Sequence, residues 1–335
     1  MGKGWIFGID GGGTSARLRI EEADRGAESR AEGRNDGAGR GRPDRPPLFY
    51  GEGGSSNPRS NPREAVLAVL RGLFARAYRE AGLRAEGCLG GFAGSAGVDR
   101  EADREPFAAL VREAAGLPPG VPVLAGNDSE PALAGAIGDV EGLLLIAGTG
   151  SIAFGRARDG SSARAGGWGH LLGDEGSAFS LAFKALSRGL RSWEGRDLPT
   201  GLMDAGLEFF GLAGPPDLVP LVYEGLDKTR IARFARVVGE YRDRGDALAL
   251  ELFEEAEREL AALVVSVDAR VGPRLERKRL AFRGGLIEGD VRLRAGVESR
   301  LAAALPGLEI VPAAAADAAA GACILARDLA NHGRR

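Results

Sequence analysis

A glycine-rich segment at residues 166–177, GGWGHLLGDEGS, carries the most chemically particular set of side chains in the chain. Its five glycines remove bulk from the backbone, while Trp168, His170, Asp174 and Glu175 supply an aromatic face and polar groups. A small polar ligand needs this mixture, because apolar area orients the ligand and fixed partners hold its hydroxyls. The alternative is a glycine-rich turn before a helix, with Trp168 packed in the core. His170 is expected to brace the turn and is left out of the catalytic set.

Two further glycine loops each follow a short apolar stretch. The segments GGGTSA at residues 11–16 and GTGSIA at residues 148–153 both fit the loose GxGxxA pattern of dinucleotide sites. Such a site needs a helix directly after the loop, and neither continuation has a helical pattern. Both loops are therefore predicted to be strand–turn–strand hairpins. Exposed N–H groups at a glycine hairpin can hold phosphate, with hydroxyls of Thr14, Ser15, Thr149 and Ser151 as further donors.

Two aspartates stand where strands are predicted to end. Asp10 directly precedes the first glycine loop, a suitable place to hold a hydrated magnesium ion beside phosphates. Asp128 lies where a strand ends and a helix begins, and a carboxylate there could take a proton from an attacking hydroxyl. From the local sequence alone, an N-cap role for Asp128 is the favoured alternative.

Composition excludes several classes of protein. The chain has 335 residues, 44% of them hydrophobic, which is enough for a large core and favours two domains. The formal net charge of -3 provides no basic field to recruit nucleic acid or a membrane surface. The two cysteines, Cys88 and Cys323, lie in unrelated segments and indicate neither a disulfide framework nor a zinc cluster.

The targeting signals of a secreted or membrane protein are not expected. The apolar stretch at residues 5–9 is too short for a signal peptide, and Asp10 follows it at once. No apolar run has the length needed to span a bilayer. The sequence therefore predicts a soluble, cytoplasmic protein.

Strand and helix patterns alternate over most of the chain, which predicts an α/β fold. Residues 61–64, NPRE, offer a helix start with Asn61 as the cap, and the chain is mostly helical after Ser177. A last helix is expected over residues 317–330, with Asp317 as its N-cap candidate. Strands are predicted over residues 5–9, 16–20, 88–93, 121–125, 143–146, 280–282 and 308–311, and the clearest helices over 107–115 and 248–271.

The segment at residues 21–47 does not fit this alternation. It is rich in Arg, Gly, Asp, Glu and Ala and has almost nothing apolar to bury. We predict a flexible, low-complexity loop between two strands. A nucleic-acid role for its Arg–Gly steps is disfavoured, because acids are interleaved and stacking aromatics are absent.

In combination, these motifs resemble the actin-like ATPase and sugar-kinase superfamily, and more closely the N-acetylglucosamine kinase and BadF/BadG/BcrA/BcrD-type ATPase family. The resemblance covers nearly the whole chain, and the motifs follow the family's order. The segment around Trp168 is close to diagnostic of amino-sugar kinases. The matching motifs are GIDGGGT at residues 8–14, GGSSNP at 53–58, GSAG at 94–97, ND at 127–128, GTGS at 148–151, the segment 167–177, and GG at 284–285.

The resemblance implies a two-domain α/β fold with a duplicated ribonuclease-H-like βββαβα core. The N-terminal domain would comprise residues 1–122 plus about 322–335, and the C-terminal domain residues 123–321, with a helical region at about 176–272. Asp128 would be the catalytic base, and Asp10 would hold Mg²⁺ through water. The sugar site would be formed by Asn57, Ser95, Asp128, Thr149, Gly167, Trp168 and Asp174. The ATP site would be formed by Gly11, Gly12, Gly13, Thr14, Ser15, Gly148, Thr149, Gly150, Gly284 and Gly285. The GSAG run replaces a more common Ser-Gly-Gly run, which leaves Ser95 the less secure member.

The implied function is an ATP- and Mg²⁺-dependent amino-sugar kinase that phosphorylates the 6-hydroxyl of N-acetylglucosamine. Glucosamine, N-acetylmannosamine and N-acetylmuramic acid remain open as substrates, and a homodimer remains open as the assembly. A BadF-type ATPase that activates a dehydratase is disfavoured, because it needs cysteine thiolates for an iron–sulfur cluster at a subunit interface. A non-enzymatic actin-like ATP switch would have no use for the tryptophan–histidine–acid segment.

Overall fold

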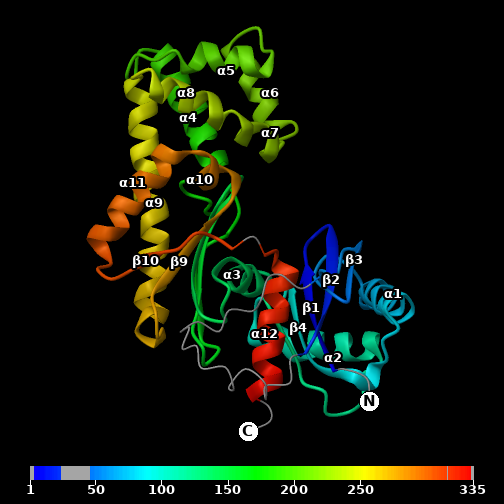
Figure 1. The fold of residues 1–335 in the computed structure, drawn as a ribbon. Coiled ribbons are helices and arrows are strands. Elements are labelled where there is room, and N and C mark those ends of the chain that lie inside the picture. The colour runs from blue at the N-terminus through cyan, green and yellow to red at the C-terminus, as the bar shows by residue number, and fades with distance from the viewer. Residues whose placement is uncertain (1–3, 24–45, 315, 333–335) are drawn as a thin grey trace. The chain divides into compact units, whose positions relative to one another are not determined.

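The computed structural model describes residues 4–23, 46–314 and 316–332 of the chain (Figure 1). The chain divides into two compact units. The first unit consists of Met1–Gly142 and Ala313–Arg335, and the second of Leu143–Pro312. In the described part of the chain, no helix has the length and apolar character needed to cross a bilayer.

A five-stranded mixed sheet organises the first unit, in the order β3-β2-β1-β4-β5. The strand β1 is antiparallel to β2, which is antiparallel to β3, while β1, β4 and β5 run parallel. The predicted strand–turn–strand hairpin after Asp10 is confirmed, because Gly11 pairs with Ala16 across it. The strands are β1 (Trp5–Gly11), β2 (Ser15–Glu22), β3 (Phe49–Gly54), β4 (Cys88–Ser95) and β5 (Val123–Gly126).

Side-chain alternation along β1 assigns helices to the two faces of this sheet. Trp5, Phe7 and Ile9 are buried in one cluster with residues of α1 (Arg63–Ala81) and α2 (Glu101–Ala115). Ile6 is buried in another cluster with residues of α3 (Ser129–Ile137) and α12 (Ala318–His332). The first unit is therefore a sheet between two helical layers. A short 3₁₀ turn, Ala85–Gly87, precedes β4.

Two helix starts differ in how well they were predicted. Asp317 caps α12 as expected, because its Oδ1 accepts a hydrogen bond from the Ala320 N–H at 2.8 Å. The prediction of Asn61 as the cap of α1 is wrong, since Pro62 occupies the N-cap position. The Asn61 amide instead donates to Ser55 Oγ at 3.0 Å, which fixes the turn that follows β3.

The second unit repeats the sheet of the first. Its order is β10-β9-β6-β7-β8, with β6, β9 and β10 parallel and β7 antiparallel to β8. Each sheet thus has a central strand, an antiparallel neighbour reached through a glycine hairpin, and parallel strands on its other side. The duplicated α/β core is confirmed. The strands are β6 (Gly142–Ala147), β7 (Ser151–Arg156), β8 (Ser162–Gly166), β9 (Arg279–Arg283) and β10 (Glu309–Ile310).

The helices of the second unit lie between β8 and β9 and after β9. In Figure 1, α4 to α8 gather at one end of this unit, and α9 extends from them along its sheet. Buried residues of α4 and α9 join those of β6 in one continuous core. The helices are α4 (Ala178–Trp193), α5 (Leu202–Phe210), α6 (Leu218–Tyr223), α7 (Lys228–Arg233), α8 (Ala235–Asp243), α9 (Ala247–Val271), α10 (Gly285–Gly289) and α11 (Val291–Ala304), with 3₁₀ turns at Pro215–Asp217 and Gly272–Arg274.

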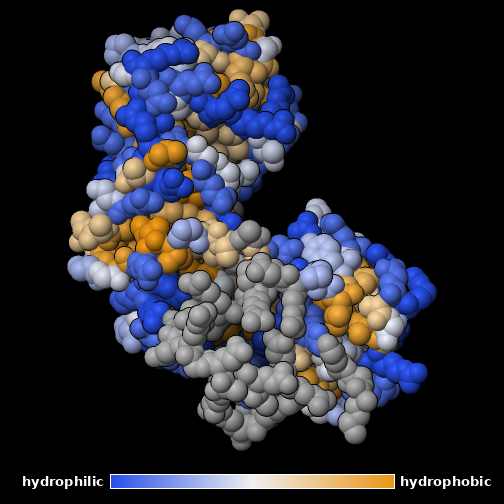
Figure 2. Space-filling view, viewed as in Figure 1, coloured by the Kyte–Doolittle hydropathy of each residue, from blue (hydrophilic) through white to orange (hydrophobic). Residues whose placement is uncertain are grey.

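On the face drawn in Figure 2, hydrophobic residues of the second unit gather near α11 and β10. Hydrophilic residues predominate over α5 to α8 there, with smaller hydrophobic areas between them (Figure 2). Single exposed apolar side chains are normal on a soluble surface. The surface over α5 to α8 has the character of solvated helices.

The division of the chain lies further along the sequence than the expected boundary between residues 122 and 123. The strand β5 pairs with β4 in the first sheet, and Ala134 of α3 shares a cluster with Ala322 of α12. Both elements therefore fall in the first unit, which ends at Gly142 and resumes at Ala313 instead of at about residue 322. Of the predicted loop at residues 21–47, Glu21 and Glu22 belong to β2, and residues 24–45 lie outside the described residues.

Candidate functional site

The first glycine hairpin presents bare backbone at its tip. The Gly12 N–H donates to Ser15 O at 2.8 Å, which closes the turn between β1 and β2. Gly13 and Thr14 are exposed, and a Cβ built on Gly13 would meet no atom within 4 Å. A ligand oxygen can therefore approach these N–H groups without obstruction, as an anion-binding turn requires.

Serines pack against the base of this hairpin. Ser55 Oγ donates to Gly12 O at 3.3 Å, and Ser95 Oγ donates to Ser56 O at 3.4 Å. A Cβ on Gly11 would lie only 3.0 Å from Ser95 Oγ, so glycine is needed for this close approach. The Ser95 side chain is fully buried. Its position is that of a support for the hairpin, in contrast to the expected direct contact with a sugar.

Asn57 is connected to the same hairpin through the turn after β3. Its backbone N–H donates to Ser55 Oγ at 3.2 Å, and its Oδ1 accepts from the Arg59 N–H at 2.8 Å. Arg59 in turn donates to Gly97 O at 2.9 Å. The turn around Asn57 and the loop after β4 are thus joined at the edge of the sheet that carries the first hairpin.

Asp10 is the last residue but one of β1 and lies partly buried beside Arg17, with 3.6 Å between Oδ2 and Nη1. Burial raises the pKa of Asp10, the Arg17 charge lowers it, and the Asp317 charge raises it. Burial destabilises the ionised form of such a carboxylate, and a nearby cation stabilises it. This is the environment in which a hydrated magnesium ion would be stabilised.

Asp128 lies between β5 and α3, and its side chain is not the cap of that helix. It makes no capping hydrogen bond, whereas Asn127 Oδ1 accepts from the Ser129 N–H at 2.9 Å. Asp128 thus occupies the N-cap position of α3, as the alternative held, but its side chain does not cap the helix. Burial raises the pKa of Asp128, and the charges of Asp10 and Asp99 raise it further. The influence of Asp10 places the two predicted carboxylates in one electrostatic environment.

The second hairpin joins β6 to β7 and is fixed at both ends. The Gly148 N–H donates to Gly150 O at 2.9 Å, and Gly148 O accepts from the Ala178 N–H at the start of α4, also at 2.9 Å. Gly284 adopts φ 105°, and a Cβ there would collide with Ala147 and lie 3.0 Å from Gly148 N. The glycine turn at residues 284–285 therefore packs directly against this hairpin, as two parts of one nucleotide site would.

Asp174 links the tryptophan segment to the second hairpin. It is the one non-glycine residue of positive φ (64°) among the described residues, and its side chain is buried. Its Oδ1 accepts from the Ser151 N–H at 3.1 Å, and its Oδ2 accepts from Lys228 Nζ at 2.7 Å. Both carboxylate oxygens of Asp174 are thus engaged by protein groups. No sequence motif marks Lys228, which lies far along the chain in the helical part.

The core-packed alternative for Trp168 is wrong. The side chain is 62% exposed, and the Arg164 guanidinium lies over its ring at 4.2 Å from the centroid. Gly167 beside it is exposed and has φ 70°. His170 makes an edge-on contact with the Phe179 ring, with 5.1 Å between the ring centroids. An exposed aromatic face next to bare backbone can stack on a sugar ring.

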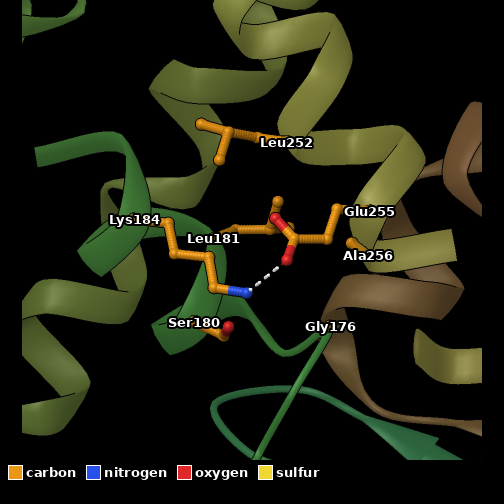
Figure 3. Close-up of a pocket in the computed structure, with 7 residues that line it drawn as sticks. All are labelled: Gly176, Ser180, Leu181, Lys184, Leu252, Glu255 and Ala256. Atoms are coloured by element: carbon orange, nitrogen blue, oxygen red, sulfur yellow. Dashed lines mark hydrogen bonds and ion pairs between the residues drawn. The ribbon is translucent and has the colours of Figure 1, made fainter. Parts of the chain in front are cut away.

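A small pocket in the second unit is separate from these residues. Lys184 and Glu255 form an ion pair across it at 2.9 Å between Nζ and Oε1 (Figure 3). None of the predicted sugar or ATP residues lines it, so it is not the expected substrate site. Its lining consists of Gly176, Ser180, Leu181, Lys184, Leu252, Glu255 and Ala256.

The predicted site residues thus form two groups, one in each unit, and neither contains a dedicated metal cage. No cluster of three or more His, Cys, Asp or Glu side chains suited to a metal ion occurs in the part of the chain that the structure describes. Mg²⁺ retains several waters and needs only one or two carboxylates, so Asp10 fits it. Cys88 and Cys323 are both buried and unpaired with each other.

Comparison with known proteins adds independent evidence. Residues 7–326 match the model of the BadF/BadG/BcrA/BcrD ATPase family. An N-acetylmuramic acid/N-acetylglucosamine kinase from Clostridium acetobutylicum is 32% identical over 324 residues, which cover 96% of this chain and 98% of that protein. An N-acetyl-D-glucosamine kinase from Dictyostelium discoideum is 31% identical over 237 residues, covering 70% of this chain and 73% of that protein.

Solved structures agree in fold. A provisionally named N-acetylglucosamine kinase from Chromobacterium violaceum superposes with a TM-score of 0.59 at 26% identity, covering 96% of this chain and 99% of that one. A ROK hexokinase from Thermus thermophilus has a TM-score of 0.56 at 19% identity over 96% of this chain and 98% of its own. At that identity the hexokinase supports the two-domain actin-like fold alone.

Proposed function

Because this chain belongs to the BadF/BadG/BcrA/BcrD ATPase family, we propose that it is an ATP-dependent amino-sugar kinase. The reaction transfers the γ-phosphate of ATP to the 6-hydroxyl of N-acetylglucosamine. The observation that carries this proposal is the hydrogen bond between Asp174 and the Ser151 N–H, which joins the tryptophan segment to a glycine hairpin. A surface suited to a sugar ring is thereby tied to one suited to phosphate. The similarity to the Clostridium acetobutylicum kinase over nearly both whole chains supports the same conclusion.

The two hairpins hold the nucleotide in this proposal. N–H groups at the tips of the hairpins of residues 11–15 and 148–150, such as those of Gly13 and Thr14, bind phosphate oxygens, and the turn at Gly284 and Gly285 supports the adenosine side. Asp10 would hold Mg²⁺ through water. When bound, the metal ion neutralises charge on the phosphate oxygens.

Asp128 acts on the attacking hydroxyl. As the O6–phosphorus bond forms and the bond between the γ-phosphorus and the bridging oxygen breaks, ADP leaves and Asp128 accepts the proton of the 6-hydroxyl. Its raised pKa brings its basicity closer to that of a useful proton acceptor at neutral pH.

Sugar contacts are assigned to Asn57, Thr149, Gly167 and Trp168. The burial of Ser95 and the paired oxygens of Asp174 favour supporting roles for these two residues in the structure as it stands. N-acetylmuramic acid is the alternative substrate that the name of the Clostridium acetobutylicum relative favours. We further propose that the enzyme acts in the cytoplasm, where ATP is supplied, and that a homodimer is its form in solution.

The test is ADP release measured with and without a panel of hexosamines. We expect ADP release that depends on N-acetylglucosamine, with phosphate appearing on O6 by NMR. Asp128→Asn should lower kcat by about 10²- to 10⁴-fold while the KM for the sugar stays within a few-fold. Asp139→Asn, beyond the other end of α3, is the matched control and should keep normal turnover. Near-normal turnover in Asp128→Asn would overturn the assignment of the base.

A further inference from the structure

We propose that Lys228 is a positioning residue for the second glycine hairpin and that it acts through Asp174. This role rests on the proposed function in one respect, the assignment of the second hairpin to the ATP site. Lys228 is the first residue of α7, in the helical part of the second unit. No motif of the chain marks it, and it does not belong to the glycine hairpins or to the tryptophan segment.

The contacts form a continuous path from Lys228 to the hairpin. Lys228 Nζ donates to Asp174 Oδ2 at 2.7 Å, and Asp174 Oδ1 accepts from the Ser151 N–H at 3.1 Å. Ser151 Oγ donates to Glu175 O at 2.7 Å, which adds a second bond between the same two segments. A Cβ on Gly150 would lie 2.7 Å from Asp174 Oδ1, so the carboxylate sits directly against the hairpin backbone.

Burial explains why this carboxylate needs a cation. The Asp174 side chain is 5% exposed, whereas that of Lys228 is 32% exposed. The carboxylate is therefore enclosed, and the lysine reaches it from the protein surface. Removing one partner of a buried ion pair is costly, because it leaves the other charge uncompensated. Without Lys228, the carboxylate of Asp174 should turn away from Ser151 toward water.

The position of Lys228 is itself well fixed. Asp227 Oδ1 caps α7 by accepting from the Thr229 N–H at 2.9 Å and the Arg230 N–H at 3.0 Å. The cap fixes the backbone at the start of α7. The Lys228 ammonium therefore reaches Asp174 from a fixed backbone position. The helical part is therefore connected to the ATP hairpin through a charged pair as well as through apolar packing.

A double-mutant cycle tests the path from Lys228 to the hairpin. Binding of a non-hydrolysable ATP analogue is measured by calorimetry, without sugar, for the wild type, Lys228→Met, Asp174→Asn and the double variant. Lys228→Met should weaken nucleotide binding about 10-fold or more, because displacement of a positioning group far from the chemistry has effects of that order. On the Asp174→Asn background the same change should weaken binding less than twofold, since the carboxylate it serves is gone. Lys228→Arg keeps the charge and should stay within about threefold of the wild type.

Lys184→Met is the matched control. Lys184 also belongs to a helix of the second unit and forms an ion pair of 2.9 Å, but its partner is Glu255 of α9 and not Asp174 (Figure 3). It should bind the analogue within twofold of the wild type. Should Lys228→Met fail to fold, Lys228→Gln replaces it in the same cycle.

Two outcomes separate this proposal from the proposed function. Independent, multiplicative effects of Lys228→Met and Asp174→Asn would overturn the role of Lys228 whatever the substrate is. If the cycle shows the expected coupling but no amino sugar stimulates ADP release, the proposed function fails and the positioning role stands.

Discussion

Asp10 and Asp128 show how a residue with a proposed function can carry a cost in stability. Each is a partly buried carboxylate whose pKa is raised mainly by burial, and each lies near other acids. A charged form that is disfavoured in the folded protein reduces stability at neutral pH. Such a cost is tolerated where the carboxylate is needed for chemistry.

The stability of Asp128→Asn follows from the direction of this shift. Because the folded-state pKa of Asp128 lies above its ordinary value of 3.8, its contribution to stability is fully present below that value and is lost as the pH rises through the folded-state pKa. Asp128→Asn removes the ionisation and should raise Tm at pH 7, by about 2–4 °C for each kcal/mol gained. The gain should shrink as the pH is lowered toward 3.8. Thermal melts of both proteins across this range, with Asp139→Asn for comparison, check the prediction. A lower Tm at pH 7 would contradict it.

Sequence reasoning located residues whose position in the fold follows from their neighbours in the chain. Asp10 and Asp128 stand at strand ends, and that position is visible in the sequence. The burial of Ser95 was not predictable, because it depends on how Ser56 packs under Gly11. Lys228 was not predictable either, since its partner Asp174 lies in another part of the chain and one lysine at a helix start carries no local signal.

At the scale of elements, the close packing of α12 against β1 depends on the absence of a side chain at Gly8. A Cβ on Gly8 would lie within 2.7 Å of the Ala322 Cβ and even closer to the α12 backbone. The contact brings the helix onto the central strand of the sheet, directly before Asp10. Small residues of α12, including Ala322 and Cys323, are fully buried there.

Gly8→Ala is therefore expected to destabilise the first unit by about 1–3 kcal/mol, because the helix must move away from the strand. Gly72→Ala provides the matched control. A Cβ on Gly72 would meet nothing within 4 Å in the exposed face of α1, so alanine there should stabilise by about 0.5–1 kcal/mol. Denaturant unfolding of both variants measures the difference. Equal stability of the two would show that α12 adjusts without cost.

Elements with strong local patterns were predictable, and those held by distant partners were not. Alternation after each glycine loop predicted the two hairpins. The apolar repeat predicted the end of α9 at Val271 and its start one residue late. The short helices α5 to α8 were expected only as a helical region, because their limits depend on packing against α4 and α9.

At the scale of the whole molecule, the first unit is made from two separated parts of the chain. The second unit is inserted between them at residues 143–312. The sequence indicated the duplication through its two similar hairpins. It did not locate the division, because only the pairing of β5 with β4 and the packing of α3 on α12 assign residues 123–142 to the first unit.

Removal of residues 313–335 should consequently damage the first unit and spare the second. The deletion uncovers the buried side chains of Ile6 and Phe92, whereas the core of the second unit contains no residue from this segment. Hydrogen exchange should show lost protection in β1 and β4 and retained protection in α9. Equal loss of protection in both units would contradict the independence of their cores.

The packing of α12 on β1 also has a consequence for biosynthesis. The helix is translated after the entire second unit, although it covers the central strand of the first. Domains usually fold on the ribosome in the order in which they emerge. One apolar face of the first sheet therefore stays uncovered until the second unit has been translated and α12 follows it. The part of the chain that is synthesised first is therefore the part that matures last.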